Sequence, residues 1–223
     1  MKPKSQHILF ILDRSGSMKD RATDVIGGFN TYVSEMQSEA AKDGMETLVS
    51  LVTFSDQHTV VFASRPVADV EPLTSGTYRA IGNTALLDTV YDSVSRYREM
   101  IGQGFFSGGR EIDAPSVLVI VFTDGMENAS RAVNWGQVQG LLGECERLGN
   151  WTFTYVGAHA GAWGQADQLT IRRRNVLDAE HLSVHDTMFQ VAESTKKLRT
   201  SYRVSDKKSS DSFFSEEAVE AAV

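Results

Sequence analysis

The sequence predicts an α/β fold: a doubly wound, mostly parallel six-stranded sheet with helices on both faces and one antiparallel edge strand. Two apolar runs, residues 7–12 and 116–124, are nearly continuous and rich in β-branched residues. Such runs are typical of strands buried on both faces of a parallel sheet. Strand patterns alternate with helical patterns, and right-handed crossovers then build the sheet first in one direction from the first strand and afterwards in the other.

The remaining strand patterns are less apolar and are bounded by polar or turn residues. They are expected at 46–54, 58–65, 151–157 and, as the weakest pattern, 175–178. The link at 55–57 is short enough for a hairpin, so the strand at 58–65 is expected to run antiparallel at one edge. Apolar residues at helical spacing predict helices at 22–42, 85–101, 134–148 and 184–203.

The expected strand order 3-2-1-4-5-6 makes the first and fourth strands neighbours. In such sheets, ligands bind in the crevice beyond the carboxyl ends of these two strands. Here the two ends read LDRSGS and FTDG, so that Asp13 and Asp124 are expected at adjacent strand tips. A buried acid at a strand tip is costly unless another group pairs with it, which makes this crevice the first place to look for a site.

Length and composition indicate one ordinary globular domain with a short addition. The chain has 223 residues, of which 41% are hydrophobic and 23% charged. Its formal net charge of -7 gives no general electrostatic attraction to nucleic acid or to an anionic membrane. We expect a domain over 1–203, followed by a tail at 204–223 that is rich in serine and charge and is either flexible or a short docked segment.

Cysteine usage and apolar runs point to an intracellular, cytoplasmic protein. Cys145 is the only cysteine, so that no intrachain disulfide forms, and its helical pattern predicts a buried filler. The N-terminal apolar run is too short for a signal-peptide core and ends at Asp13. No apolar run approaches the roughly 20 residues that span a bilayer.

The segment DRSGS supplies oxygen ligands of two kinds. Asp13 contributes a carboxylate, while Ser15 and Ser17 contribute neutral hydroxyls around a turn that Gly16 permits. Thr84, just before the helix at 85–101, adds a further hydroxyl at the same end of the sheet, and Asp124 adds the second carboxylate. Hard oxygen donors of this kind suit Mg²⁺, with Mn²⁺ or Ca²⁺ as alternatives.

These segments, in this order and on these elements, resemble the metal-ion-dependent adhesion site of the von Willebrand factor type A domain family. The resemblance covers about residues 5 to 203 in element order. It implies that Ser15, Ser17 and Thr84 ligate the metal directly, and that Asp13 and Asp124 bind it directly or through water. It also implies that an open coordination position accepts a Glu or Asp from a partner protein.

The resemblance is strongest to bacterial stand-alone intracellular members, which implies a non-enzymatic adaptor in a multiprotein assembly, as in stress-response systems. The partner and the oligomeric state are not readable from the sequence. Arg14, beside the site, is expected to strengthen the attraction for an acidic partner. In some family members the last helix shifts on binding; here that helix is expected at 184–203.

Two alternatives remain open. In the first, Asp13, Ser15, Thr84 and Asp124 only cap helices and form turns. In the second, the chain is a Mg²⁺-dependent phosphatase of the haloacid dehalogenase kind, although that chemistry needs a second acid two positions after the first and position 15 is a serine.

Several nearby polar residues are assigned supporting or ordinary roles. Asp88 is expected on the helix surface or behind the site, and Asn128 is expected to cap its loop, with Glu127 beside it at the rim. His181 and His185 are four residues apart and are candidates for one helix face, yet no third ligand accompanies them, so ordinary roles are expected.

Overall fold

A six-stranded sheet forms the centre of the protein, as predicted. The structure is a computed structural model that describes residues 3–106, 113–216 and 219. The strand order is β3-β2-β1-β4-β5-β6, and only β3 runs antiparallel to its neighbour. The strands are β1 (Ser5–Asp13), β2 (Glu46–Phe54), β3 (His58–Pro66), β4 (Ser116–Thr123), β5 (Trp151–Gly157) and β6 (Val176–Asp178).

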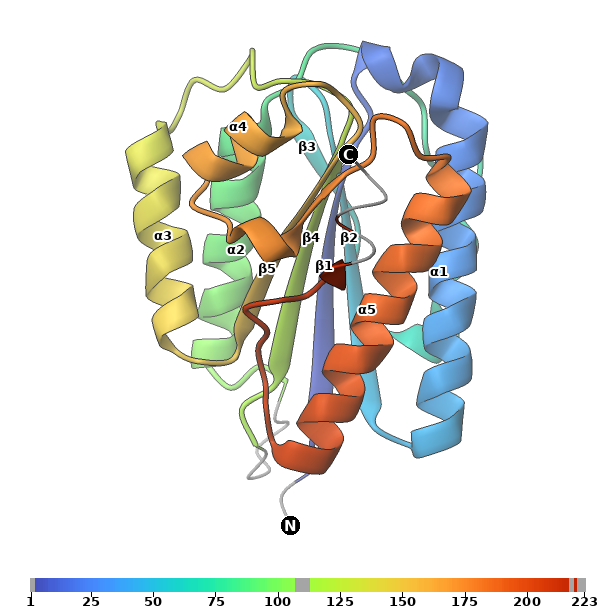
Figure 1. Cartoon of the computed structure of the whole chain (residues 1–223), viewed down its shortest axis with the longest axis vertical. Coiled ribbons are helices and arrows are strands. Elements are labelled where there is room, and N and C mark those ends of the chain that lie inside the picture. Colours follow the sequence, from blue (N-terminus) through green and yellow to red (C-terminus); the bar gives the residue numbers. More distant parts are fainter. Residues whose placement is uncertain (1–2, 107–112, 217–218, 220–223) are drawn as a thin grey trace.

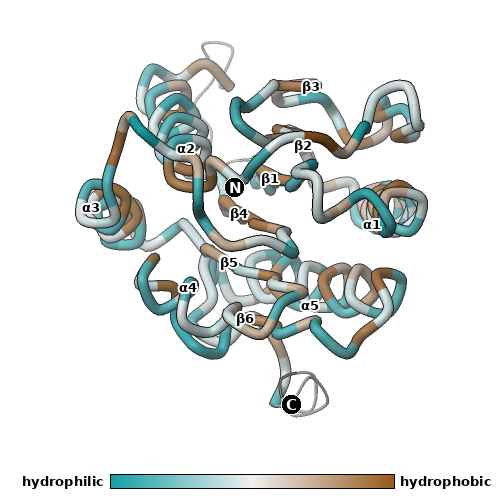
Figure 2. The backbone as a smooth tube through the Cα atoms, turned by 90° about the horizontal axis from the view of Figure 1, so that it is seen from above, coloured by the Kyte–Doolittle hydropathy of each residue, from teal (hydrophilic) through white to brown (hydrophobic). Residues whose placement is uncertain are grey.

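Helices cover both faces of this sheet. They are α1 (Ala22–Asp43), α2 (Leu86–Gly102), α3 (Trp135–Arg147), α4 (Ala162–Gln168) and α5 (Val184–Ser205). Figures 1 and 2 show α1 and α5 on one face, with α2, α3 and α4 on the other. The four long helices begin and end within two residues of the predicted positions, and the short α4 lies between β5 and β6, outside the four predicted helices.

The central strand β1 explains why both layers form. Ile8, Phe10 and Leu12 pack into the core beneath α1 and α5, while Leu9 and Ile11 pack into the core beneath α2 and α3. Every residue of β1 is buried, including Asp13 at its end. A continuous apolar strand therefore places a carboxylate at the carboxyl end of β1, which lies between β2 and β4 in the sheet (Figure 1).

A buried ion pair fixes α5 to α1 at the opposite edge of the sheet. Arg199 of α5 donates from Nε to Asp43 Oδ2 at 2.8 Å and from Nη2 to the Met45 carbonyl at 2.8 Å. Burial acts to raise the pKa of Asp43, but the hydrogen bonds from Arg199 and Met45 outweigh burial and hold the pKa below its usual value. Removing one partner of such a pair leaves an uncompensated buried charge, so α5 is firmly tied at this end.

The first part of the C-terminal tail is docked on the domain. Asn175 donates to the Ser210 carbonyl at 3.1 Å and accepts from the Phe213 amide at 2.8 Å. Phe213 and Phe214 are buried and belong to the core beneath α1 and α5. Residues 206–216 therefore pack against the domain in this structure. The division of the chain near residue 203 and the flexibility of the tail at 204–223 stay predictions.

No helix among the described residues is long and apolar enough to cross a membrane. Cys145 is buried in α3, and burial raises the pKa of its thiol to about 11, in agreement with the expected filler role.

Candidate metal centre

Three loops meet beyond the carboxyl ends of β1 and β4. The loop that follows β1 contacts the loop that precedes α2, because the Gly16 amide donates to the Gly82 carbonyl at 2.8 Å. The loop that follows β4 contacts the same segment, because the Asn128 amide donates to the Thr84 carbonyl at 3.1 Å. The crossover topology brings the ends of β1 and β4 together, and these backbone bonds then fix the loops to one another.

The side chains of the five predicted ligands lie together in these loops. Ser15 Oγ lies 3.0 Å from Ser17 Oγ, and Ser17 Oγ donates to Asp124 Oδ1 at 2.5 Å. Asp13 Oδ1 accepts from the Ser15 amide at 2.6 Å, while its Oδ2 accepts from Thr123 Oγ1 at 2.5 Å. A chain of short contacts thus runs from one carboxylate to the other through the two serines.

Thr84 lies next to the other four residues, as the surroundings of Gly125 show. A Cβ atom placed on Gly125 would lie 2.9 Å from Thr84 Oγ1 and 3.6 Å from both Asp13 Oδ2 and Ser17 Oγ. Oxygens from all three loops therefore surround the space next to this Cα, which only a glycine leaves open. The five residues, Asp13, Ser15, Ser17, Thr84 and Asp124, form one oxygen-lined cradle; that they bind a metal stays a prediction.

The electrostatics of the cradle favour a cation. Asp13 is completely buried, and burial raises its pKa to about 6, against the hydrogen bonds from Thr123 and Ser15; the charge of Asp124 raises it further. Two carboxylates this close together, one of them out of water, disfavour each other's charged form. A divalent cation would offset both charges, and the three hydroxyls would add neutral donors without adding repulsion. The residues present therefore fit a small hard cation.

The hydroxyls are not used as helix caps. The residue preceding α2 is Ala85 rather than Thr84. The side chains that accept from amides in the first turn of α2 are Glu127 and Ser130, not Thr84. Ser15 precedes the 3-10 helix at Gly16–Arg21, without a side-chain cap bond. Only the contact between Asp13 and the Ser15 amide has the form of a turn, and a turn of this kind is compatible with metal binding as well.

Two acidic residues outside the cradle brace the loop after β4 against α2. Glu127 accepts from the amides of Leu87, Ala129 and Ser130, at 2.9, 2.9 and 2.7 Å. Asp88 accepts from the amides of three consecutive residues, Arg131, Ala132 and Val133. Each carboxylate thus satisfies backbone donors that would otherwise lack partners. Asp88 is therefore a supporting group, as expected.

Asn128 and Gln165 complete the brace. Asn128 Oδ1 accepts from the Thr84 amide at 2.9 Å, so that the expected loop cap also fixes a candidate ligand. Gln165 of α4 accepts from the Glu127 amide at 2.6 Å and donates to the Gly125 carbonyl at 3.2 Å. The contacts of Gln165 were not predicted from the sequence, and Glu127 was predicted only as a residue at the rim of the site. The DGMEN segment is the only sequence signal for this brace.

The histidines do not form a second centre. His181 lies before α5 and only His185 lies within it, so the idea that they share a helix face was wrong. His159 lies at the rim, where its Nδ1 accepts from the Gly161 amide at 3.1 Å. Among the described residues, no group of three or more His, Cys, Asp or Glu side chains could hold a metal. The cradle is a different kind of site, because it has only two acidic side chains and its other three oxygens come from Ser15, Ser17 and Thr84.

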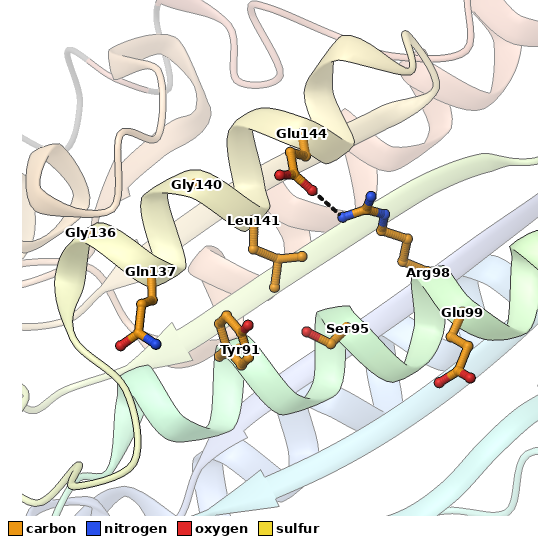
Figure 3. Close-up of a pocket in the computed structure, with 9 residues that line it drawn as sticks. All are labelled: Tyr91, Ser95, Arg98, Glu99, Gly136, Gln137, Gly140, Leu141 and Glu144. Carbon is orange, nitrogen blue, oxygen red and sulfur yellow. Dashed lines mark hydrogen bonds and ion pairs between the residues drawn. The ribbon is translucent and has the colours of Figure 1, made fainter.

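A cavity of about 500 Å³ lies elsewhere, in the groove between α2 and α3 (Figure 3). Tyr91 and Leu141 face each other across it, and Arg98 donates to Glu144 at 2.6 Å across the groove. None of the five cradle residues lines this cavity. Arg98 and Glu144 pair with each other. The residues lining this groove therefore form no cluster of oxygen ligands like that of the cradle.

The fold of this chain resembles that of several solved proteins, although its sequence is not close to any of them. No protein-family model matches the sequence, and no curated protein does. Solved structures do match the fold. The mussel byssus protein PTMP1, in a form described as having a zinc-occupied MIDAS motif, matches with a TM-score of 0.54 and 17% identity over 85% of this chain and 48% of that one.

Two further structures match in the same way. A protein described as von Willebrand factor type A from Catenulispora acidiphila gives a TM-score of 0.53 and 14% identity over 86% of this chain and 43% of that one. The manganese-loaded TRAP protein of Plasmodium vivax gives 0.52 and 13%, over 84% and 74%. The chain spans about half the length of the PTMP1 chains that it matches. At these identities, the likeness establishes the von Willebrand factor type A fold.

Replacing Gly125 with alanine tests the cradle directly. The new methyl group would crowd Thr84 Oγ1 and intrude on the oxygens, so Gly125→Ala is expected to weaken Mn²⁺ binding by roughly 10-fold or more, measured by calorimetric titration. Gly143→Ala is the matched control, because a Cβ there meets nothing within 4 Å. Equal Mn²⁺ affinity in the two variants would contradict the cradle.

Replacing Glu127 tests the brace. Glu127→Gln keeps the size of the side chain but leaves one oxygen to accept bonds from four donors, three amides and the Ser130 hydroxyl. We expect Mn²⁺ affinity to fall by about 10- to 100-fold with an unchanged circular dichroism spectrum. The control is Glu144→Gln, which changes the exposed pair with Arg98. If Glu127→Gln binds Mn²⁺ as well as this control, the brace has no part in positioning the ligands.

Proposed function

We propose that the chain is a member of the von Willebrand factor type A family that binds a divalent cation in the cradle, and through this cation the acidic side chain of a partner protein. Ser15, Ser17 and Thr84 bind the cation directly, and Asp13 and Asp124 bind it directly or through water. Mg²⁺ is the expected ion, with Mn²⁺ or Ca²⁺ as alternatives. A bound cation supplies a positive centre whose remaining coordination position accepts a carboxylate.

The observation that carries this proposal is the ratio of acids to hydroxyls in the cradle. Five oxygen donors from three loops converge, and only two of them are carboxylates. Two negative charges offset a divalent cation without leaving an excess that would repel an approaching acidic residue. Two solved relatives, PTMP1 with a zinc-occupied MIDAS motif and the manganese-loaded TRAP protein, support the binding of a divalent cation by this fold.

An adaptor role follows from the same arrangement. The cradle lies at the edge of the sheet, and Ser17 and Gly16 are exposed there. We propose a non-enzymatic, cytoplasmic adaptor of bacterial type, as in stress-response assemblies. The phosphatase alternative is disfavoured, because the position two residues after Asp13 holds Ser15, whose hydroxyl contacts Ser17 and cannot act as a general acid and base in phosphoryl transfer.

Thermal unfolding in EDTA, Mg²⁺ and Mn²⁺ tests cation binding. A cation at a hundredfold excess over its Kd stabilises the native state by about 2.7 kcal/mol, which for a chain of this size raises Tm by roughly 5–10 °C. Ser17→Ala and Asp124→Asn should abolish this rise, whereas Ser95→Ala, in the groove between α2 and α3, should keep it. If neither cation changes Tm or the three variants respond alike, the cradle binds no cation.

A further inference from the structure

Two large apolar side chains stand exposed beside the cradle. Ile81 is 58% exposed and Met126 is 59% exposed. Ile81 lies three residues before Thr84, and Met126 lies two residues after Asp124, so each belongs to a loop that carries a candidate ligand. Isolated exposed apolar residues are common on protein surfaces and need no explanation, whereas two on adjacent ligand loops call for one.

Both side chains are presented by a fixed backbone. The Ile81 amide donates to the Arg14 carbonyl at 2.7 Å, and the Arg14 amide donates to the carbonyl of Phe54 at 2.7 Å. On the other loop, the residues on either side of Met126 are both held by Gln165. A fixed backbone leaves only the side-chain rotamers to be ordered when a partner covers these residues, which favours their use in recognition.

A basic side chain, Arg14, and an acidic one, Asp56, lie on the loops near these two residues. The Arg14 side chain makes no ion pair with any residue that the structure describes. The nearby acid Asp56 is engaged by the Asn83 side chain at 2.7 Å and by the Asn83 amide at 3.2 Å. The rim therefore combines exposed apolar side chains with an Arg14 guanidinium that has no ion-pair partner among the described residues.

We propose that Ile81 and Met126 select the residues that flank the partner's acidic side chain. In an extended segment, residues two positions apart point to the same face, so the recognised segment carries large apolar residues two positions before and after its Asp or Glu. The partner is thus an exposed, extended protein segment with alternating apolar and acidic side chains on one face. This inference rests on the proposed function, because the central acid is the one that the bound cation accepts.

A peptide selection tests this inference. A random peptide library with one fixed central glutamate is selected on the immobilised protein in Mn²⁺ and recovered with EDTA. We expect Leu, Ile, Met or Phe to be enriched two positions from the glutamate. The selected peptides should bind Ile81→Ser and Met126→Ser roughly 5- to 30-fold more weakly, the effect of losing one or two kcal/mol of apolar burial.

Leu148→Ser is the matched control. Leu148 is 61% exposed, yet it follows α3 at the opposite edge of the sheet, so its loss should leave peptide binding unchanged. Mn²⁺ titration of Ile81→Ser and Met126→Ser should show unchanged metal affinity. The weaker peptide binding would then come from lost apolar contacts and not from a damaged cradle. Peptides without apolar enrichment, equal binding by all three variants, or no recovered peptide from metal-loaded protein would overturn the inference. A protein that binds no Mn²⁺ would overturn the proposed function itself.

Discussion

The arrangement of the loops beyond the carboxyl ends of β1 and β4 depends on the buried carboxylate of Asp13. It ends a strand whose two faces are both covered by helices, and it is completely buried. A charge in that position is costly, and its raised pKa, about 6, reflects the cost. Thr123, the Ser15 amide and the nearby serine hydroxyls lower the cost only in part. A bound cation would offset the rest of the free-energy cost of burying the Asp13 charge.

The rest of the edge holds the oxygens in place around that carboxylate. Glu127 and Asp88 use their charges on backbone amides rather than on cations, which joins α2 to the loop after β4. Because Asn128 fixes Thr84 and Gln165 fixes both Gly125 and Glu127, a movement of one loop would disturb the others. Pre-positioned oxygens of this kind would bind a cation without first having to become ordered.

Most of the fold could be predicted from the sequence, because the patterns that define its strands and helices are local. The continuous apolar runs of β1 and β4 are readable from one strand each, and the crossover rule then makes Asp13 and Asp124 neighbours. The brace could not be read in the same way. Glu127 and Gln165 bond to backbone groups far along the chain, and any residue could supply such amides. The docked tail depends similarly on Asn175 and two phenylalanines whose pairing has no sequence pattern.

Anomalous diffraction from crystals grown with Mn²⁺ would show whether the cradle holds a cation. We expect one strong anomalous peak within direct coordination distance of Ser15 Oγ, Ser17 Oγ and Thr84 Oγ1, with Asp13 and Asp124 binding the ion directly or through water. The peak should disappear in crystals of Ser17→Ala grown under the same conditions. A cradle without a peak, or Mn²⁺ found only at other residues, would contradict the claim that the buried charge of Asp13 serves to hold a cation.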